Sequence, residues 1–340
     1  MRYFRLAGTR TVKTGIAIFI TAWVCVLLDW PPVFAVITAI VTIEPTVADS
    51  IRKGIVRFPA SAIGSAYAVL FISLFGNSPL TYTLAAVFTI ATCFKLRLHA
   101  GLLVATLTAV AMVEVIHSNY FIAFLIRLGT TTTGLLVSTL VNMFVLPPDY
   151  TKEITKNIQQ ISKQTGRVIH QSLTQIVEQR NQIGSDTASK LNELAKKLHH
   201  TELLIKFQQD ESKYHPLVGN EKELFHHGIK QINQLKLMHY HLNNLMNTPP
   251  TTKTWRERDR AIMLQAANEL TQSLEDQRYY DPVRHQKQLE QLMEIYWVNN
   301  EEIINEQAHP ANFPPKLIIM YEFVTIYSLV AQFYPTLTSN

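Results

Sequence analysis

The chain has few of the residues that build a nucleotide-driven motor, a disulfide scaffold or a metal centre. Only 12 of its 340 residues are Gly, and none forms the Gly-rich loop that cradles phosphates, which argues against an ATP-driven pump. The two cysteines, Cys25 and Cys93, lie inside apolar runs and are predicted to be small buried side chains. The two-His, one-Glu motif of zinc hydrolases is also absent. We therefore expect no enzyme, no bound metal and no cofactor.

Acidic residues are scarce in the first half of the chain. Residues 1–148 hold ten Lys/Arg and four Asp/Glu, a net charge of +6, whereas residues 149–340 hold 21 and 22, a net charge of −1. The basic excess is scattered between hydrophobic runs and forms no stripe on a polar domain, so nucleic acid is not an expected partner. We expect two domains, an apolar one at 1–148 and a polar one at 149–340.

Charge-free runs dominate the first half, at 14–28, 30–43, 58–94, 98–113 and 128–148. A bilayer span needs roughly 17–25 mainly apolar residues. The 37-residue run at 58–94, which is broken by a turn at 76–79, therefore accounts for two spans. The sequence predicts an all-α membrane protein with six transmembrane helices, at about 8–28, 31–45, 55–75, 80–95, 98–116 and 121–146.

Lys and Arg residues favour one side of these spans. Nine of them precede the first span or lie in the loops after the second and fourth, and none lies in 29–32, 76–79 or 117–120. Because positive charge stays on the cytoplasmic side, the N-terminus is predicted to be cytoplasmic. Six spans return the chain to the cytoplasm, so we expect a multi-pass protein of the plasma membrane with residues 149–340 inside the cell.

The apolar half contains a repeat with a period of 70 residues. Residues 38–44 align with 108–114, and an Arg follows each Glu by 13 residues and a Gly follows each Arg by seven. The matched pairs are Glu44 with Glu114, Arg57 with Arg127, and Gly64 with Gly134. Three spans per copy is an odd number, so the second copy must be inverted across the membrane, which is a signature of transporters.

The repeat identifies candidate binding residues. Arg57 and Arg127 are predicted to attract an anion at opposite mouths of one pathway, with Lys13 in the same role at the inner end of the first span. The alternative is that Glu44 and Glu114 pair with the two Arg and close each helix hairpin while the Arg stems snorkel. The two interpretations are compatible if an anionic substrate competes with the carboxylate.

Small and hydroxyl residues recur at every fourth position in the third and sixth spans. This spacing lines one helix face and allows close helix packing. The functional alternative is a narrow pathway lining to which Ser61, Thr130 and Thr131 contribute hydroxyls.

These residues resemble those of a known family. The motifs are Arg10-Thr11-Val12-Lys13-Thr14, Glu44-Pro45-Thr46-Val47, Arg57 followed by Ala60-Ser61 and Gly64, Arg127 through Gly134, and Val141-Asn142 leading to Leu146-Pro147-Pro148-Asp149. They are similar to the aromatic acid exporter family, a group that includes fusaric-acid-resistance proteins and, more distantly, plant aluminium-activated malate transporters. Ala60-Ser61 departs from the Gly-Thr expected there. The resemblance implies export of organic, above all aromatic, carboxylate anions.

The polar half shows helical periodicity with no strand alternation. Breaks at 183–185, 216, 248–250, 281–282 and 313–315 predict about six helices in a bundle, with 317–330 as a buried core helix rather than a seventh span. We expect a homodimer, because six short spans make a thin bundle and this half offers a surface for pairing. The competing hypothesis is a membrane-anchored scaffold or sensor that works through its cytoplasmic helical domain.

Overall fold

The computed structural model describes residues 8–115, 119–178, 185–249, 254–306 and 313–334. Within these ranges all regular structure is helical, in twelve α-helices and two short 3-10 turns, which confirms the predicted all-α class. The chain divides into two compact units. Unit 1 comprises Met1–Asp149 with Phe207–Pro216, and unit 2 comprises Tyr150–Lys206 with Leu217–Asn340.

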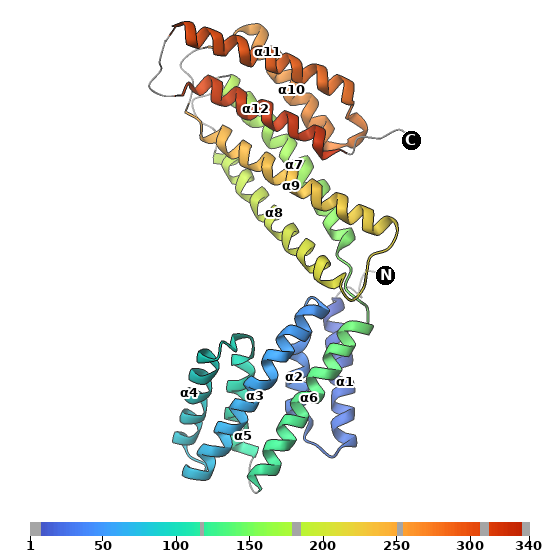
Figure 1. The fold of residues 1–340 in the computed structure, drawn as a ribbon, viewed down its shortest axis with the longest axis vertical. Helices are drawn as coiled ribbons and strands as arrows, with labels where there is room; N and C mark the ends of the chain where they lie inside the picture. Colours follow the sequence, from blue (N-terminus) through green and yellow to red (C-terminus); the bar gives the residue numbers. More distant parts are fainter. Residues whose placement is uncertain (1–7, 116–118, 179–184, 250–253, 307–312, 335–340) are drawn as a thin grey trace. The chain divides into compact units, whose positions relative to one another are not determined.

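Unit 1 is built mainly from six α-helices that alternate in direction (Figure 1). They are α1 (Thr9–Leu27), α2 (Pro32–Thr42), α3 (Val47–Phe75), α4 (Pro79–Lys95), α5 (Leu102–Val115), which follows the 3-10 turn η1 (His99–Gly101), and α6 (Tyr120–Phe144). Local sequence sets their ends. Ser78 caps α4 by accepting from the Thr81 N–H at 3.3 Å. Gly76 ends α3 with φ = 61°, a left-handed conformation that favours glycine.

The predicted boundaries agree with these helices to within a few residues, except at the start of α3. That helix was expected at 55–75 but begins at Val47. The Thr46 hydroxyl accepts from the Asp49 N–H at 3.1 Å, and Asp49 lies in the first turn, where a negative charge is favourable. A charge-free run locates only the apolar part of a helix. Helix α3 begins in the charged sequence that precedes its apolar part, so its start was predicted too late.

Helices α3 and α6 lie side by side at the centre of unit 1 (Figure 1). Helix α3 also packs on α5, and α6 packs on α2. A Cβ atom on Gly64 would stand 2.3 Å from the carbonyl oxygen of Ala105, and one on Gly134 would stand 2.4 Å from that of Ala35. Only glycine permits these approaches. The two contacts correspond at the 70-residue period, since Ala35 and Ala105 are also 70 positions apart.

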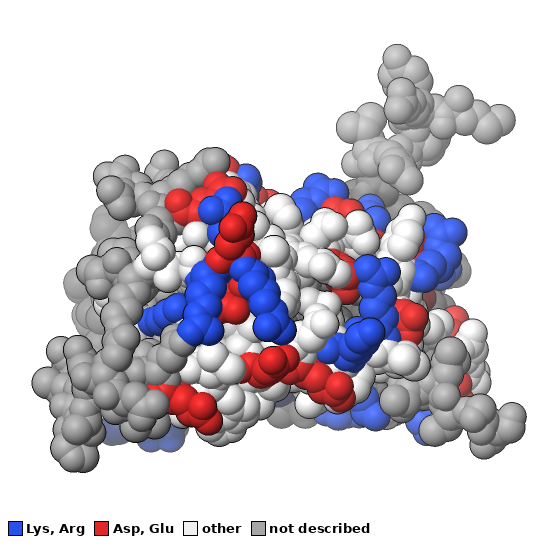
Figure 2. All heavy atoms as spheres, turned by 90° about the horizontal axis from the view of Figure 1, so that it is seen from above, with Lys and Arg blue, Asp and Glu red and all other residues white. Residues whose placement is uncertain are grey.

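Unit 2 contains α7 (Thr151–Val177), most of α8 (Ser185–Glu211), α9 (Asn220–Asn247), α10 (Glu257–Glu275), the 3-10 turn η2 (Gln277–Tyr279), α11 (Pro282–Glu306) and α12 (Pro315–Phe333). Helix α7 packs on α9 and α10, and α12 packs on α9 and α11. Apolar stripes on these helices form the core, with Leu235, Met263 and Phe323 fully buried. Figure 2, which looks onto unit 2 from the side of α11, shows Lys/Arg and Asp/Glu side chains interspersed.

Four of the described helices are long and apolar enough to cross a membrane by length and composition: α1, α3, α6 and α12. Helix α2 and the segment His99–Val115 are apolar but shorter. Helix α12 differs from the other three because 56% of its apolar window is buried inside the protein, against 22–39% for the others. Its acidic residue, Glu322, is buried against His241 at 2.6 Å and Asn244 at 3.2 Å, both on α9.

Candidate functional site

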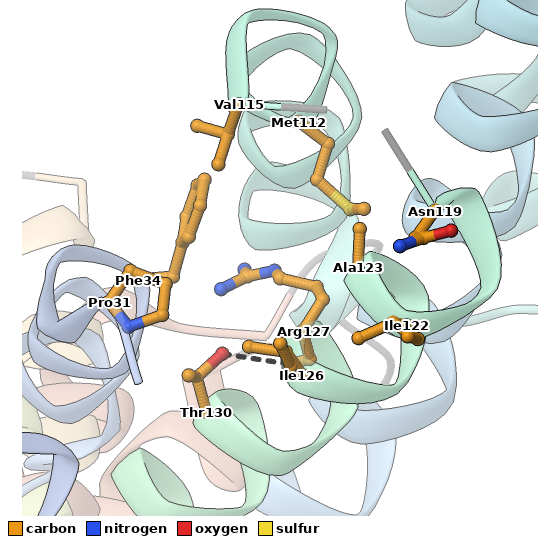
Figure 3. Close-up of a pocket in the computed structure, with 10 residues that line it drawn as sticks. All are labelled: Pro31, Phe34, Met112, Val115, Asn119, Ile122, Ala123, Ile126, Arg127 and Thr130. Atoms are coloured by element: carbon orange, nitrogen blue, oxygen red, sulfur yellow. Dashed lines mark hydrogen bonds between the residues drawn. The ribbon is translucent and has the colours of Figure 1, made fainter. Parts of the chain in front are cut away.

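A cavity of about 270 Å³ lies in unit 1 between the start of α2, the last turn of α5 and the first half of α6 (Figure 3). Its lining residues are Pro31, Phe34, Met112, Val115, Asn119, Ile122, Ala123, Ile126, Arg127 and Thr130. The walls are mainly apolar, and Arg127 is the one charged side chain among these ten. The cavity therefore combines apolar surface with a single positive charge.

Arg127 is almost completely buried, with 4% of its surface exposed. Its guanidinium points toward Phe34 (Figure 3) and lies 4.3 Å from the centre of that ring, in cation–π geometry. Nη2 donates to the Thr108 hydroxyl, whereas Nε and Nη1 have no acceptor among the described residues. No described carboxylate forms an ion pair with Arg127. A buried cation without a counter-charge is costly, so this arrangement favours a bound anion.

Close packing of α6 on α2 brings Arg127 to Phe34. The ring of Trp30 covers Gly129, where a Cβ would stand 2.4 Å from the nearest ring atom. Five residues, about one and a half turns of helix, separate this contact from the one between Gly134 and Ala35, which also joins α6 to the α2 region. The two glycines hold α6 against the beginning of α2, so the Arg127 side chain reaches the aromatic ring.

The equivalent residue of the first half, Arg57, has a different environment. Its Nη2 donates to Glu44 Oε1 at 2.7 Å, and Lys53 Nζ donates to the other oxygen at 2.8 Å. The side chains of Arg57 and Glu44 are both nearly buried. The predicted Glu–Arg pair is therefore present in this half, where it closes the junction between α2 and α3.

Lys13 lies close to the same junction and is 3% exposed, so it is a buried cation rather than a snorkelling one. Its Nζ donates to Asn142 Oδ1 at 2.9 Å. The Asn142 amide in turn donates to Ser50 Oγ at 2.9 Å and to the carbonyl oxygens of Glu44 and Thr46 at 3.1 and 3.3 Å. Asn142 thus ties α1 and α6 to the turn that carries Glu44.

Three hydroxyls connect the two halves at the crossing of α3 and α6. Ser61 Oγ lies 3.2 Å from Thr131 Oγ1 and 3.4 Å from Thr108 Oγ1, which also binds Arg127. Ser61 and Thr131 are 70 residues apart, so equivalent positions of the repeat touch each other. Thr130 lines the cavity, and its hydroxyl donates to the Arg127 carbonyl at 3.0 Å.

Glu114 does not pair with Arg127, which corrects the expectation of a second closed Glu–Arg hairpin. It is exposed at the end of α5 and accepts a hydrogen bond from the Tyr82 hydroxyl on α4. Here the structure breaks the symmetry of the repeat. The first carboxylate neutralises its Arg, and the second is held elsewhere.

A further carboxylate of unit 1 comes from a distant part of the sequence. Glu211, in the segment 207–216, is completely buried and accepts from the Val47 N–H at 3.0 Å. Its other oxygen lies 2.7 Å from Nδ1 of His215. It therefore satisfies a backbone donor at the start of α3, next to the turn that holds Glu44.

The predicted binding residues did not include four residues that surround these groups: Phe34, Tyr82, Thr108 and Asn142. Thr108 has a signal, because it is the repeat equivalent of Thr38 within the best-aligned segment. Asn142 is an amide inside the charge-free run 128–148, where a polar group needs a partner. Phe34 and Tyr82 carry no signal, since aromatic residues in apolar helices are common.

The apolar helices and the buried cationic cavity define a helical membrane protein. Residues 5–145 match the family described as aromatic acid exporter family member 1. A UPF0421 protein of Oceanobacillus iheyensis is 47% identical over 340 residues, covering 99% of this chain and 97% of the relative. One from Bacillus cereus is 40% identical over 336 residues (98% and 94%), and one from Staphylococcus aureus is 40% identical over 253 residues (74% and 76%).

The chain therefore belongs to the UPF0421 proteins, and its residues 5–145 match the aromatic acid exporter family. The family match covers the residues of unit 1 that form the cavity and the repeat, and it ends before unit 2 begins. The resemblance seen in the sequence motifs is confirmed. The two relatives from Oceanobacillus iheyensis and Bacillus cereus extend the similarity beyond unit 1, because they align with nearly the whole chain, unit 2 included.

Proposed function

We propose that the chain is a transporter or channel of the plasma membrane that exports organic carboxylate anions, aromatic ones above all, without ATP hydrolysis. The observation that carries the proposal is Arg127, a buried cation that has no acid partner among the described residues and lies at the wall of an apolar cavity. The family match supports the same class of function.

The cavity suits an acid with one aromatic ring. Nε and Nη1 of Arg127 have hydrogens left for the oxygens of a carboxylate, and charge-assisted hydrogen bonds are about twice as strong as neutral ones. Phe34 and Met112 offer apolar surface for a ring beside the guanidinium. At about 270 Å³ the cavity is slightly smaller than the usual range for ligand sites, which favours a small substrate.

In this proposal unit 1 supplies six membrane spans as a 3+3 inverted repeat, forming a membrane domain over 1–148. Support comes from the contact of Ser61 with Thr131 and from the matched approaches of Gly64 and Gly134. The uneven distribution of Lys and Arg favours a cytoplasmic N-terminus and a cytoplasmic helical domain over 149–340. A homodimer in the lipid bilayer is part of the same proposal.

The pathway would pass the two Arg residues on either side of the Ser61–Thr131 contact. Each Arg precedes its hydroxyl residue by four positions, and α3 and α6 run in opposite directions. At 1.5 Å rise per residue the two cations are separated by about 12 Å along the helix axes. An anion leaving one Arg would meet the hydroxyls before it reached the other.

Flux through purified full-length protein in liposomes tests the proposal. Release of labelled benzoate should be lost in Arg127→Gln and kept in Arg52→Gln, a matched control because Arg52 is exposed. An imposed pH gradient would show whether protons drive the flux. If folded wild-type protein moved no aromatic or aliphatic acid, the proposal would fail, and the membrane-anchored scaffold or sensor would become the better hypothesis.

A further inference from the structure

The wall of the Arg127 cavity carries one charge and few other polar groups. Besides Arg127, the polar side chains among the ten lining residues are those of Asn119 and Thr130. Both are neutral, and the Thr130 hydroxyl already donates to the Arg127 carbonyl at 3.0 Å. The other side chains drawn around the guanidinium in Figure 3 are apolar. The described wall can therefore balance a single negative charge.

The two other buried cations in the described part of unit 1 do not supply a second positive charge. Lys13 donates to Asn142 at 2.9 Å, and Arg57 donates to Glu44 at 2.7 Å. Neither Lys13 nor Arg57 is among the residues that line the cavity. A second carboxylate inside the cavity would lose its hydration against apolar walls and gain no counter-charge, which is costly.

We propose that the cavity selects its substrates by charge: it binds carboxylates that carry one negative charge on an apolar body and excludes dianions of similar size. This inference deepens the proposed function and rests on it, since it assumes that Arg127 binds the substrate's carboxylate. Nε and Nη1 of Arg127 have no acceptor among the described residues, so one carboxylate satisfies the guanidinium and makes the site neutral. A second carboxylate would leave a net negative charge in apolar surroundings.

The discrimination is expected to be large. The penalty for burying an unpaired ion in a protein is enough to weaken binding by at least about 100-fold. Carboxyl groups have pKa values near 4, so both carboxyl groups of a dicarboxylic acid are ionised at about pH 7.5. A dianion bound at Arg127 therefore carries the full penalty at this pH.

The experiment measures the binding of four acids to the full chain in liposomes at about pH 7.5. Benzoate and 3-methylbenzoate carry one charge. Isophthalate has a second carboxylate in place of the methyl group, and its monomethyl ester is slightly larger but lacks the second charge. We expect 3-methylbenzoate and the ester to bind within about threefold of benzoate, and isophthalate to bind at least about 100-fold more weakly.

A second cation at the cavity should relax this selection. Val115 lines the cavity from the last turn of α5 and is 51% exposed, so the protein can accommodate a longer and charged side chain there. Val115→Lys should tighten isophthalate binding at least about tenfold, because the ammonium gives the second carboxylate a partner. Val115→Met is the matched control, because it adds length without charge and should leave the ratio of the Kd values for isophthalate and 3-methylbenzoate unchanged.

The outcomes separate this inference from the proposed function. If isophthalate binds as well as 3-methylbenzoate, or if the ester binds as weakly as isophthalate, the cavity does not select by charge and the inference is overturned. The same conclusion holds if Val115→Lys and Val115→Met change isophthalate binding equally. In these cases the proposed function stands as long as Arg127→Gln abolishes benzoate binding. Equal binding of benzoate by wild-type protein and Arg127→Gln would overturn the proposed function itself.

Discussion

Replacing Arg57 and Arg127 by Met should change the stability of the protein in opposite directions. The two residues are equivalent in the repeat and both are buried, but in the described part of the chain only Arg57 has a carboxylate partner. Met keeps most of the side-chain volume and removes the charge. The comparison therefore isolates the effect of the missing counter-charge at Arg127.

The magnitudes follow from the partners of each Arg. Removing one member of a buried ion pair costs about 3–5 kcal/mol. Glu44 keeps Lys53 at 2.8 Å, so we expect a cost somewhat below this range, about 2–3 kcal/mol, for Arg57→Met. Replacing a buried charge by an apolar side chain stabilises by about 1–4 kcal/mol. For Arg127→Met the lost hydrogen bond to Thr108 and the lost contact with Phe34, about 1 kcal/mol each, offset part of that gain.

The assay is thermal unfolding of the purified full chain in detergent without substrate. For a unit of this size 1 kcal/mol corresponds to about 2–4 °C in Tm. Arg57→Met should lower the Tm by about 4–12 °C, whereas Arg127→Met should leave it unchanged or raise it by a few degrees. Arg52→Met, at a side chain that is 70% exposed, serves as the control and should not shift it. A fall in Tm for Arg127→Met as large as that for Arg57→Met would refute the reasoning, because the charge of Arg127 would then be compensated within the protein.

Two further predictions concern packing and pH. Gly134→Val should lower the Tm markedly, because the valine side chain would collide with the Ala35 carbonyl and overpacking alone costs about 1–3 kcal/mol. Gly15→Val is the control, because a Cβ atom there meets nothing within 4 Å, and it should have a much smaller effect in the same thermal unfolding experiment. Burial lowers the pKa of His285, which stacks on Tyr327 at 4.2 Å, so the unfolded chain binds a proton more readily than the folded one. The contribution of neutral His285 to folding stability is complete above about pH 6.5 and decreases as the pH falls below that value. His285→Phe should therefore reduce the loss of Tm between pH 7.5 and 5.5. An equal loss of Tm in the wild-type and variant proteins would contradict this assignment.

Helix positions were predictable because charge-free runs and turn residues carry that information locally. The start of α3 was not, since it depends on the Thr46 cap and on a helix that extends into charged sequence. The spacing of Glu and Arg in the repeat predicted which residues to compare. It did not predict that Glu44 pairs and Glu114 does not, because the partner of Glu114 is Tyr82, which lies 32 residues away on another helix.

The contacts of the site itself needed three-dimensional packing. Phe34 meets Arg127 because Gly129 and Gly134 allow α6 to approach α2, and helical spacing alone does not show which helices pair. Asn142 joins three segments through one amide, a role that its place in an apolar run leaves open. The residues that reasoning from sequence finds least easily are those whose partners lie on other helices.

The difference between the two halves has a physical reason under the proposed function. If both Glu–Arg pairs were closed, unit 1 would be more stable but would offer no free cation to an anion. If both were open, two buried cations about 12 Å apart would repel each other and each would lack a counter-charge. With one closed pair and one open cation, only one of the two equivalent Arg residues carries this cost, and that residue is available to a carboxylate. Under the proposed function, Glu44 binds Arg57 in the way that the carboxylate of the substrate would bind Arg127.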